Sequence, residues 1–357
     1  MMKDQEFIHR KVDHLRYALQ EAAQSRSSAE WDQFRLIHDS LPDLNFEEVS
    51  CRSSFLNHKL PTPFYIAGMT AGHPDADQIN DRLAKFAAKR GWIFGLGSQR
   101  RELSPEFSDL PSHGLKKLYP NLQVVSNLGI AQLIEINQKN QWSRLKEILH
   151  ASSAILIAVH LNPLQEAIQA EGTPQFKGGF SALEMLKEKI SLPLVLKETG
   201  SGMSESFLKR IRLLEPFAVD VSGLGGTHWG RVEGLRAPEE SISSQLGQTF
   251  KNWGVGTLTS VRVAKTIFAN TSTEIWASGG VRNGLDAAVC FAMGASRVGF
   301  AKAALEAALK GDEALDLWMQ TREAELRTAL FCTNSASLHD LNESKVQTTF
   351  TTDMRAP

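Results

Sequence analysis

The chain has 357 residues, 42% of them hydrophobic, and its 39 Lys and Arg residues nearly balance its 40 Asp and Glu residues. This charge balance argues against nucleic-acid binding and against attraction to anionic membranes. The start, MMKDQEFIHRKVDHLRYALQ, lacks the apolar core of a signal peptide, and no run reaches the roughly 18 apolar residues of a membrane helix. We therefore expect a cytoplasmic protein without membrane contact.

The first predicted element is a helix that starts near residue 9. An apolar stripe at helical spacing consists of Val12, Leu15, Leu19 and Ala22. Another face carries Arg10, Lys11 and His14, three and four residues apart. Such a charged face is usually exposed to solvent and has no further role. The alternative is that it binds an anion, and this interpretation needs support from other features of the sequence.

Eight short apolar runs then follow one another along the chain. They are PFYIAGM (63–69), WIFGLG (92–97), LQVVSN (122–127), AILIAVH (154–160), PLVLKE (193–198), AVDVSG (218–223), IWASGG (275–280) and RVGF (297–300). Most gaps hold about 25 to 35 residues, enough for a loop, a helix and a return. The simplest closed arrangement is an α/β fold of the (β/α)8 barrel type (TIM barrel), and a doubly wound open sheet is the alternative.

This pattern predicts a single domain over residues 1–357. An N-terminal helical extension (1–60) precedes the barrel (61–310), which has a long insertion after its sixth strand, and a C-terminal helical segment and tail (311–357) follows.

Polar and Gly-rich residues follow the strands, where a barrel builds its active site. The turns GLGGTHW (223–229) and SGGVRNG (278–284) come after the sixth and seventh strands, a common place for a phosphate bound by backbone N–H groups. Glycine lets the backbone approach phosphate oxygens closely. The expected donors are Gly279, Gly280, Arg282, Ala301 and Lys302.

Two further strand ends carry distinctive side chains. Lys197 ends an apolar strand, so its ammonium would enter the barrel mouth and need an anionic partner. It could be a Schiff-base nucleophile, a cation beside a reduced flavin, or a Lys paired with Glu198 or an Asp without chemistry. The stretch VHLNPLQE (159–166) contains a His, an Asn, a Gln and a Glu at the end of a buried strand, which is one pattern expected of an active site. The alternative is that His160 is an ordinary core histidine and that Glu166 only starts the next helix.

Taken in order, HRKVDH, GMTAG, GSQR, SNLG, HLNPLQE, LKETGSGMS, DVSGLGGTHW and ASGGVRNGLD resemble the type 2 isopentenyl-diphosphate isomerases, which are FMN-dependent (β/α)8 barrels. The resemblance runs from about residue 9 to about residue 305, with Ala71 and His228 as small departures. It implies bound FMN, Mg²⁺, NAD(P)H as the flavin reductant and interconversion of isopentenyl and dimethylallyl diphosphate. It also suggests a homo-oligomer, for example an octamer.

The resemblance assigns site residues one by one. The FMN contacts are Gly68, Met69, Thr70, Ser98, Asn127, Lys197, Ser222 and Thr227, and the FMN phosphate contacts are Gly279, Gly280, Val281, Arg282, Ala301 and Lys302. The substrate contacts are Arg10, Lys11, His14, Ser98, Gln99, Arg100, His160, Asn162 and Gln165. Glu166 is the Mg²⁺ ligand, since a dication that also binds phosphate oxygens needs only one or two carboxylates.

The catalytic candidates are His160, Gln165 and Lys197. Because Gln165 is neutral, N5 of reduced FMN is the expected proton carrier. The N-terminal segment is expected to fold over the barrel mouth as a lid that orders with substrate. Two alternatives stay open, an FMN-dependent oxidoreductase of a hydroxy acid or nucleotide and a non-catalytic flavin-binding sensor.

Overall fold

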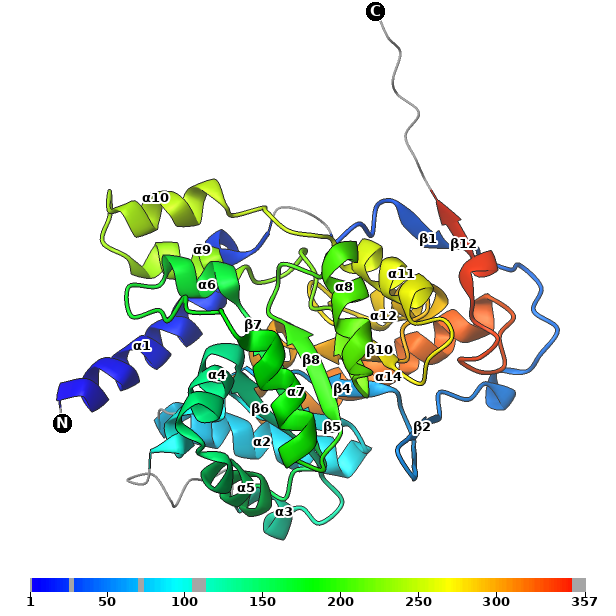
Figure 1. Cartoon of the computed structure of the whole chain (residues 1–357). Coiled ribbons are helices and arrows are strands. Elements are labelled where there is room, and N and C mark those ends of the chain that lie inside the picture. The colour runs from blue at the N-terminus through cyan, green and yellow to red at the C-terminus, as the bar shows by residue number, and fades with distance from the viewer. Residues whose placement is uncertain (1, 26–28, 70–73, 105–113, 349–357) are drawn as a thin grey trace, which may run out of the picture.

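Eight parallel strands close into a barrel in the centre of the molecule (Figure 1), each paired with the next along the chain and the last with the first. The computed structural model describes residues 2–25, 29–69, 74–104 and 114–348. The strands are β4 (Phe64–Ile66), β5 (Ile93–Gly95), β6 (Gln123–Gly129), β7 (Leu156–Leu161), β8 (Leu194–Glu198), β9 (Ala218–Asp220), β10 (Glu274–Ala277) and β11 (Arg297–Phe300). Each strand coincides with one of the eight apolar runs to within two residues at its ends or lies inside it, so the expected (β/α)8 barrel is confirmed.

The strands bury both of their faces, as parallel strands do. Tyr65, Val125 and Val195 pack with one another inside the barrel, whereas their neighbours Phe64 and Ile66 pack in the larger core between the strands and the outer helices. This alternation follows from the two-residue period of a strand. Because all eight strands are parallel, their carboxyl ends lie together at one mouth of the barrel.

Helices follow every strand. They are α2 (Pro74–Arg90), α3 (Leu115–Leu118), α4 (Ile130–Lys139), α5 (Trp142–Ala151), α6 (Pro163–Ile168), α7 (Gly179–Lys189), α8 (Glu205–Ile211), α11 (Thr257–Ile267), α12 (Gly284–Ala292), α13 (Lys302–Leu309) and α14 (Asp312–Cys332), with 3-10 turns η3 (Gln99–Leu103) and η6 (Arg212–Leu214). The expected insertion after the sixth strand contains α9 (Trp229–Arg236) and α10 (Ile242–Thr249). None of the helices in the described ranges has the length and apolarity needed to cross a bilayer.

The segments outside the barrel hold its two ends. At the N-terminus, α1 (Met2–Ala18) packs against α9 beside the mouth (Figure 1) and leads into the turn η1 (Glu21–Ala23). The hairpin of β2 (Ser53–Phe55) and β3 (His58–Leu60) adds Phe55 and Leu60 to the core inside the barrel. Along the chain, the turn η2 (Phe46–Glu48) lies between η1 and β2, and the turn η7 (Glu343–Lys345) comes just before the last strand.

One pairing joins the two ends of the chain. Strand β1 (Phe34–Leu36) pairs antiparallel with β12 (Val346–Thr348). Strands β1, β2, β3 and β12 were not predicted, because runs of three residues are too short to show a period.

Candidate active site

A cavity of about 850 Å³ opens at the carboxyl ends of the strands, within the size range of small-molecule sites. Its wall includes the predicted site residues Arg10, Lys11, His14, Gly68, Met69, Ser98, Arg100, Asn127, His160, Asn162, Gln165, Glu166, Lys197, Ser222, Thr227, Gly279, Gly280, Val281, Arg282, Ala301 and Lys302. Thr70 lies outside the described residues, as does Ala71. One cavity is therefore lined both by the residues predicted to contact FMN and by those predicted to contact the substrate.

The two Gly-rich turns pack against each other at one end of this cavity. Gly279 and Gly280 have φ angles of +98° and +77°, which favour glycine. A Cβ on Gly279 would lie 2.1 Å from the carbonyl oxygen of Gly223, so a side chain would push the turns apart. Arg282 donates to the carbonyl oxygens of Gly225 and Gly280, at 3.2 and 3.3 Å. We call residues 223–228, residues 279–282 and the start of α13 the phosphate cradle.

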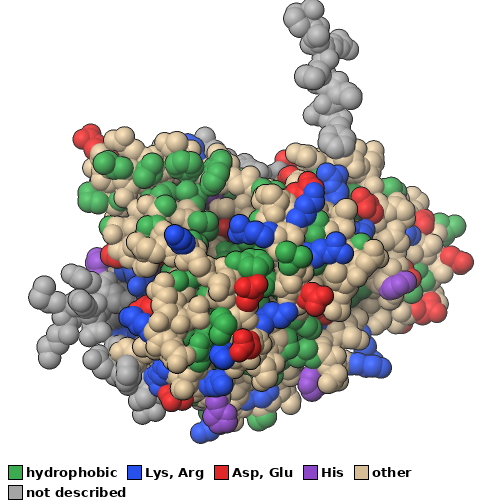
Figure 2. Space-filling view, viewed as in Figure 1, with side chains coloured by type: hydrophobic (Ala, Val, Ile, Leu, Met, Phe, Trp, Pro, Cys, Tyr) green, Lys and Arg blue, Asp and Glu red, His purple; other side chains and the backbone are tan. Residues whose placement is uncertain are grey.

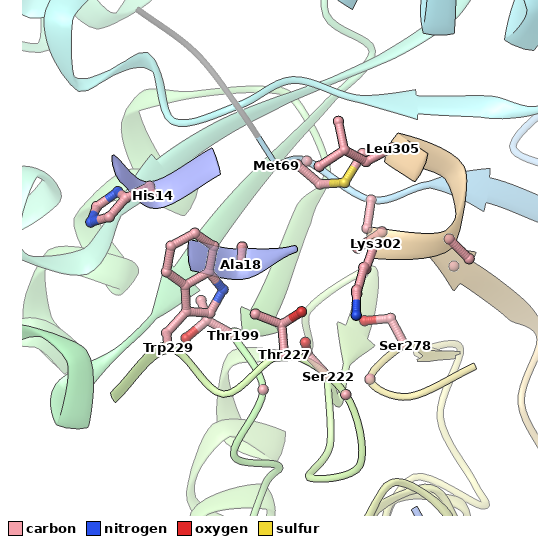
Figure 3. Close-up of a pocket in the computed structure, with 18 of the residues that line it drawn as sticks. His14, Ala18, Met69, Thr199, Ser222, Thr227, Trp229, Ser278, Lys302 and Leu305 are labelled. Atoms are coloured by element: carbon pink, nitrogen blue, oxygen red, sulfur yellow. The ribbon is translucent and has the colours of Figure 1, made fainter. Parts of the chain in front are cut away.

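The start of α13 completes the cradle. Ala301 is the N-cap of this helix, whose unpaired N–H groups and dipole favour an anion. In Figure 3 the side chain of Lys302 points toward Ser278. The Lys302 ammonium lies 3.1 Å from the exposed carboxylate of Glu21. A helix start, a cation and glycine turns without side chains fit the phosphate group of FMN.

Lys197 is paired within the barrel mouth. Its ammonium lies 3.1 Å from Asp220, whose other oxygen accepts hydrogen bonds from Ser278 Oγ (2.7 Å) and from the Ser222 backbone (3.3 Å). The pairing alternative is therefore observed, with Asp220 as the partner. The ammonium also borders the cavity, so it can act on a ligand there as well.

Glu198 turns away from Lys197 and organises the next loop. Its carboxylate accepts backbone N–H groups of Thr199 (2.6 Å), Gly200 (2.6 Å) and Ser201 (2.5 Å). Burial raises the pKa of Glu198 to about 7, against the opposing effect of these hydrogen bonds. Thr199 and Gly200 are thereby fixed in the cavity wall, although the sequence analysis did not single them out.

His160 is held as a neutral acceptor. Its Nδ1 lies 2.8 Å from Asn127 Oδ1, and the Asn127 amide nitrogen donates to the Leu96 carbonyl. The Asn127 oxygen must therefore accept a hydrogen bond from Nδ1–H, which leaves Nε2 of the neutral ring unprotonated. Burial, together with the nearby charges of Lys197 and Lys11, lowers the pKa of His160 to about 3. His160 is thus no source of protons near neutral pH.

The rest of the HLNPLQE cluster forms a connected network. Asn162 donates to both Gln165 Oε1 and Glu166 Oε1, at 3.1 Å each, and Gln165 Nε2 donates to Glu233 at 2.8 Å. The second oxygen of Glu166 accepts the Thr173 backbone N–H at 2.6 Å. No group of three or more potential metal-binding side chains occurs in the described part of the chain. Glu166 is a buried carboxylate in the cavity wall, the kind of oxygen ligand that Mg²⁺ uses together with phosphate oxygens and water.

Glu233 on α9 joins this network to the N-terminal helix. Its carboxylate lies 2.8 Å from His14 Nε2 and 2.5 Å from Arg236. Although burial opposes ionisation, the contacts with His14, Arg236 and Gln165 lower the pKa of Glu233 to about 2. The Trp229 ring meets the His14 ring edge-on at 5.2 Å, and Figure 3 shows it close to Ala18 of α1. Helix α9 thereby holds α1 at the mouth.

Helix α1 turns its charged face inward. Arg10 and His14 are buried in the cavity wall, whereas Val12 is 41% exposed. Burial and the charges of Arg10 and Arg100 lower the pKa of Lys11 to about 8. The proposed apolar stripe is corrected, since α1 ends at Ala18 and leaves Leu19 and Ala22 outside the helix. Arg10, Lys11 and Arg100 thus line the same cavity as the HLNPLQE cluster.

Comparisons with known proteins agree with this geometry. A family model described as FMN-dependent dehydrogenase matches residues 108–348. Isopentenyl-diphosphate delta-isomerase of Legionella pneumophila (strain Corby) is 48% identical over 338 residues, which cover 95% of this chain and 97% of that protein. The chain belongs to the isopentenyl-diphosphate delta-isomerase family. The Bdellovibrio bacteriovorus member is 44% identical, over 96% of this chain and 98% of its own.

Solved structures share the fold of this isomerase family at much lower identity. The flavin-binding domain of baker's yeast flavocytochrome b2 has a TM-score of 0.65 at 14% identity, over 92% of this chain and 79% of that chain. A mandelate oxidase variant with (S)-mandelic acid has a TM-score of 0.64 at 16% identity, over 94% of each chain. These similarities support the barrel fold.

One residue assigned from the isomerase family lies apart from the cavity wall. Gln99 is buried behind it, where its amide nitrogen donates to Glu102 at 2.8 Å and its oxygen accepts from Ser126 and from the Asn127 backbone. It borders Asn127 rather than the open cavity. The 3-10 turn η3 starts at Gln99, and Arg100, one position later, does line the cavity.

Proposed function

We propose that this chain interconverts isopentenyl diphosphate and dimethylallyl diphosphate by a 1,3-allylic proton shift, with reduced FMN and Mg²⁺. One observation carries the proposal: a single cavity is lined by the phosphate cradle and also by Arg10, Lys11 and Arg100 together with the Glu166 carboxylate. The cradle would bind the phosphate of the flavin, and the cations and Glu166 would bind the diphosphate of the substrate. The expected homo-oligomer and the lid role of α1 belong to the same proposal.

The cradle would hold the FMN phosphate, and the ends of the first, third and sixth strands would hold the ring through Gly68, Met69, Asn127, Ser222 and Thr227. When bound and reduced by NAD(P)H, FMN supplies a nitrogen, N5, that can exchange a proton. Lys197 would stabilise negative charge on the ring, since its ammonium borders the cavity while Asp220 fixes its position.

The other end would hold the diphosphate. Arg10, Lys11 and Arg100 would neutralise the phosphates, and Glu166 would bind Mg²⁺ shared with the phosphate oxygens. His160 and Asn162 would add contacts without negative charge. Charges close to the diphosphate would thus balance without a cage of carboxylates.

Gln165 would position the alkene. Its oxygen accepts from Asn162 and its nitrogen donates to Glu233, so both ends of the amide are fixed. Glu233, with a pKa of about 2, carries no proton to give near neutral pH. These side chains would therefore orient the substrate and exclude water, which agrees with a proton carrier outside the side chains.

The test is purification followed by a spectrum and an assay. We expect a flavin band near 450 nm, about the usual position for oxidised flavins. After reduction, we expect dimethylallyl diphosphate to form from isopentenyl diphosphate only with Mg²⁺ present. A purified protein that binds no flavin when FMN is added, or that forms no product, would contradict the proposal.

One observation favours the second candidate, an FMN-dependent oxidoreductase. His14 in the cavity wall lies 2.8 Å from the buried Glu233 carboxylate, the arrangement of a general base and the group that orients it. Incubation with a hydroxy acid and an electron acceptor tests it. Reduction of the acceptor would support this candidate over the isomerase.

A further inference from the structure

Residues 29–31 cross the phosphate cradle without lining the cavity. Ala29 and Glu30 have φ angles of +55° and +72°, a left-handed backbone at two successive residues that both carry a Cβ. This conformation is unfavourable, and it persists only where the surrounding structure imposes it. Such strain at the edge of a ligand site suggests a role there.

Ala29 and Trp31 contact both Gly-rich turns. A Cβ on Gly225 would lie 2.1 Å from the Ala29 methyl group, and one on Gly280 would lie 3.0 Å from it. The fully buried Ala29 thus fills the space that the two glycines leave. Trp31 Nε1 donates to the Gly280 carbonyl at 3.3 Å, and that oxygen also accepts from Arg282.

Glu30 fixes the helix that supports the cradle from outside. Its two oxygens accept the Thr259 backbone N–H (2.7 Å) and the Thr259 hydroxyl (2.5 Å) in the first turn of α11. A carboxylate is favoured there by the helix dipole. Thr257, which starts α11, donates its hydroxyl to the Gly279 carbonyl at 2.6 Å. A continuous set of contacts therefore runs from Glu30 through α11 to the cradle.

We propose that residues 29–31 form a clamp that holds the phosphate cradle in its binding conformation, with Glu30 as the positioning residue. The proposal rests on the proposed FMN site. The clamp acts on the phosphate end of the flavin, because its contacts reach Gly225, Gly279 and Gly280. Ligands without a phosphate should gain little from it.

The test measures binding of FMN and of riboflavin, which lacks the phosphate, to flavin-free protein by fluorescence titration. Glu30→Gln keeps the size of the side chain and removes its charge. We expect FMN to bind about tenfold more weakly, the usual effect of losing a charge-assisted hydrogen bond, and riboflavin to bind as before. Simple electrostatics predicts the opposite sign, because the substitution removes a negative charge near an anionic phosphate.

Two further variants complete the experiment. Glu48→Gln is the matched control, since Glu48 accepts the Asn45 backbone N–H at 2.6 Å at the turn η2 in the same extension, away from the cavity wall. It should bind FMN as the unaltered chain does. Trp31→Phe keeps an aromatic ring, loses the hydrogen bond to Gly280 and should weaken FMN binding severalfold, even if Glu30→Gln fails to fold.

Three results would overturn the clamp. The first is FMN binding that is unchanged or tighter in Glu30→Gln, or in Trp31→Phe if Glu30→Gln does not fold. The second is an equal loss of FMN and riboflavin binding. The third is an effect of Glu48→Gln on FMN binding that equals the effect of Glu30→Gln. Failure of the unaltered chain to bind either flavin would instead refute the proposed function itself.

Discussion

Glu166 is the one carboxylate in the HLNPLQE cluster, and a substitution there distinguishes the proposed metal binding from flavin binding. We expect Glu166→Gln to purify with FMN bound, because the expected flavin contacts come from other strands, and to lose isomerase activity about a hundredfold when Mg²⁺ loses its protein ligand. Flavin content and turnover of the same sample measure both. Parallel loss of flavin and activity would mean that Glu166, through its bond to the Thr173 backbone, is structural.

Lys11 gives the site a pH dependence. Its pKa is lowered to about 8 by burial and by the charges of Arg10 and Arg100, so the free enzyme loses this positive charge as the pH rises through about 8. The charged form attracts diphosphate, so kcat/KM should fall above that pH. Lys11→Arg keeps its charge at all these pH values and should flatten the profile. An identical fall in Lys11→Arg would assign the titration to another group.

Helix α1 places its buried charged face in the wall of the cavity. His14 holds the helix there through its contacts with Trp229 and Glu233. We expect Arg10→Ala to raise KM for the diphosphate substrate at least about tenfold, the scale of a lost charged contact. Arg16→Ala removes the same charge from an exposed position of the same helix and should leave KM unchanged. Equal KM values for both variants would refute the proposed role of α1 in substrate binding.

The barrel was predictable element by element because each strand is a short apolar run bounded by turn residues, and the strand ends predicted most of the cavity wall. Glu233 was not predictable, since it lies in an insertion whose helix shows little apolar periodicity and its partners in the site, His14 and Gln165, are distant in sequence. The positions of Ala29 and Glu30 depend on contacts with turns about 200 residues later along the chain, well beyond local signals.

Over the whole molecule, charge is nearly balanced, with 39 Lys and Arg residues against 40 Asp and Glu residues. Figure 2 shows Lys and Arg side chains interspersed with Asp and Glu on one face, in keeping with the net charge of −1. The cations expected to bind phosphates lie instead in the cavity wall. An anionic ligand should therefore be attracted to the mouth rather than to the surface in general. Assembly into a homo-oligomer stays a prediction, which light scattering of the purified protein would test.

We propose a flavin enzyme that catalyses a reaction without net electron transfer. Moving a double bond by one carbon leaves the oxidation level of the substrate unchanged, so the reductant should be needed once and not once per product. The decisive measurement follows NAD(P)H and dimethylallyl diphosphate together under anaerobic conditions. We predict no activity with oxidised FMN and many turnovers after a single reduction. One NAD(P)H consumed per product, or full activity with oxidised FMN, would contradict the account.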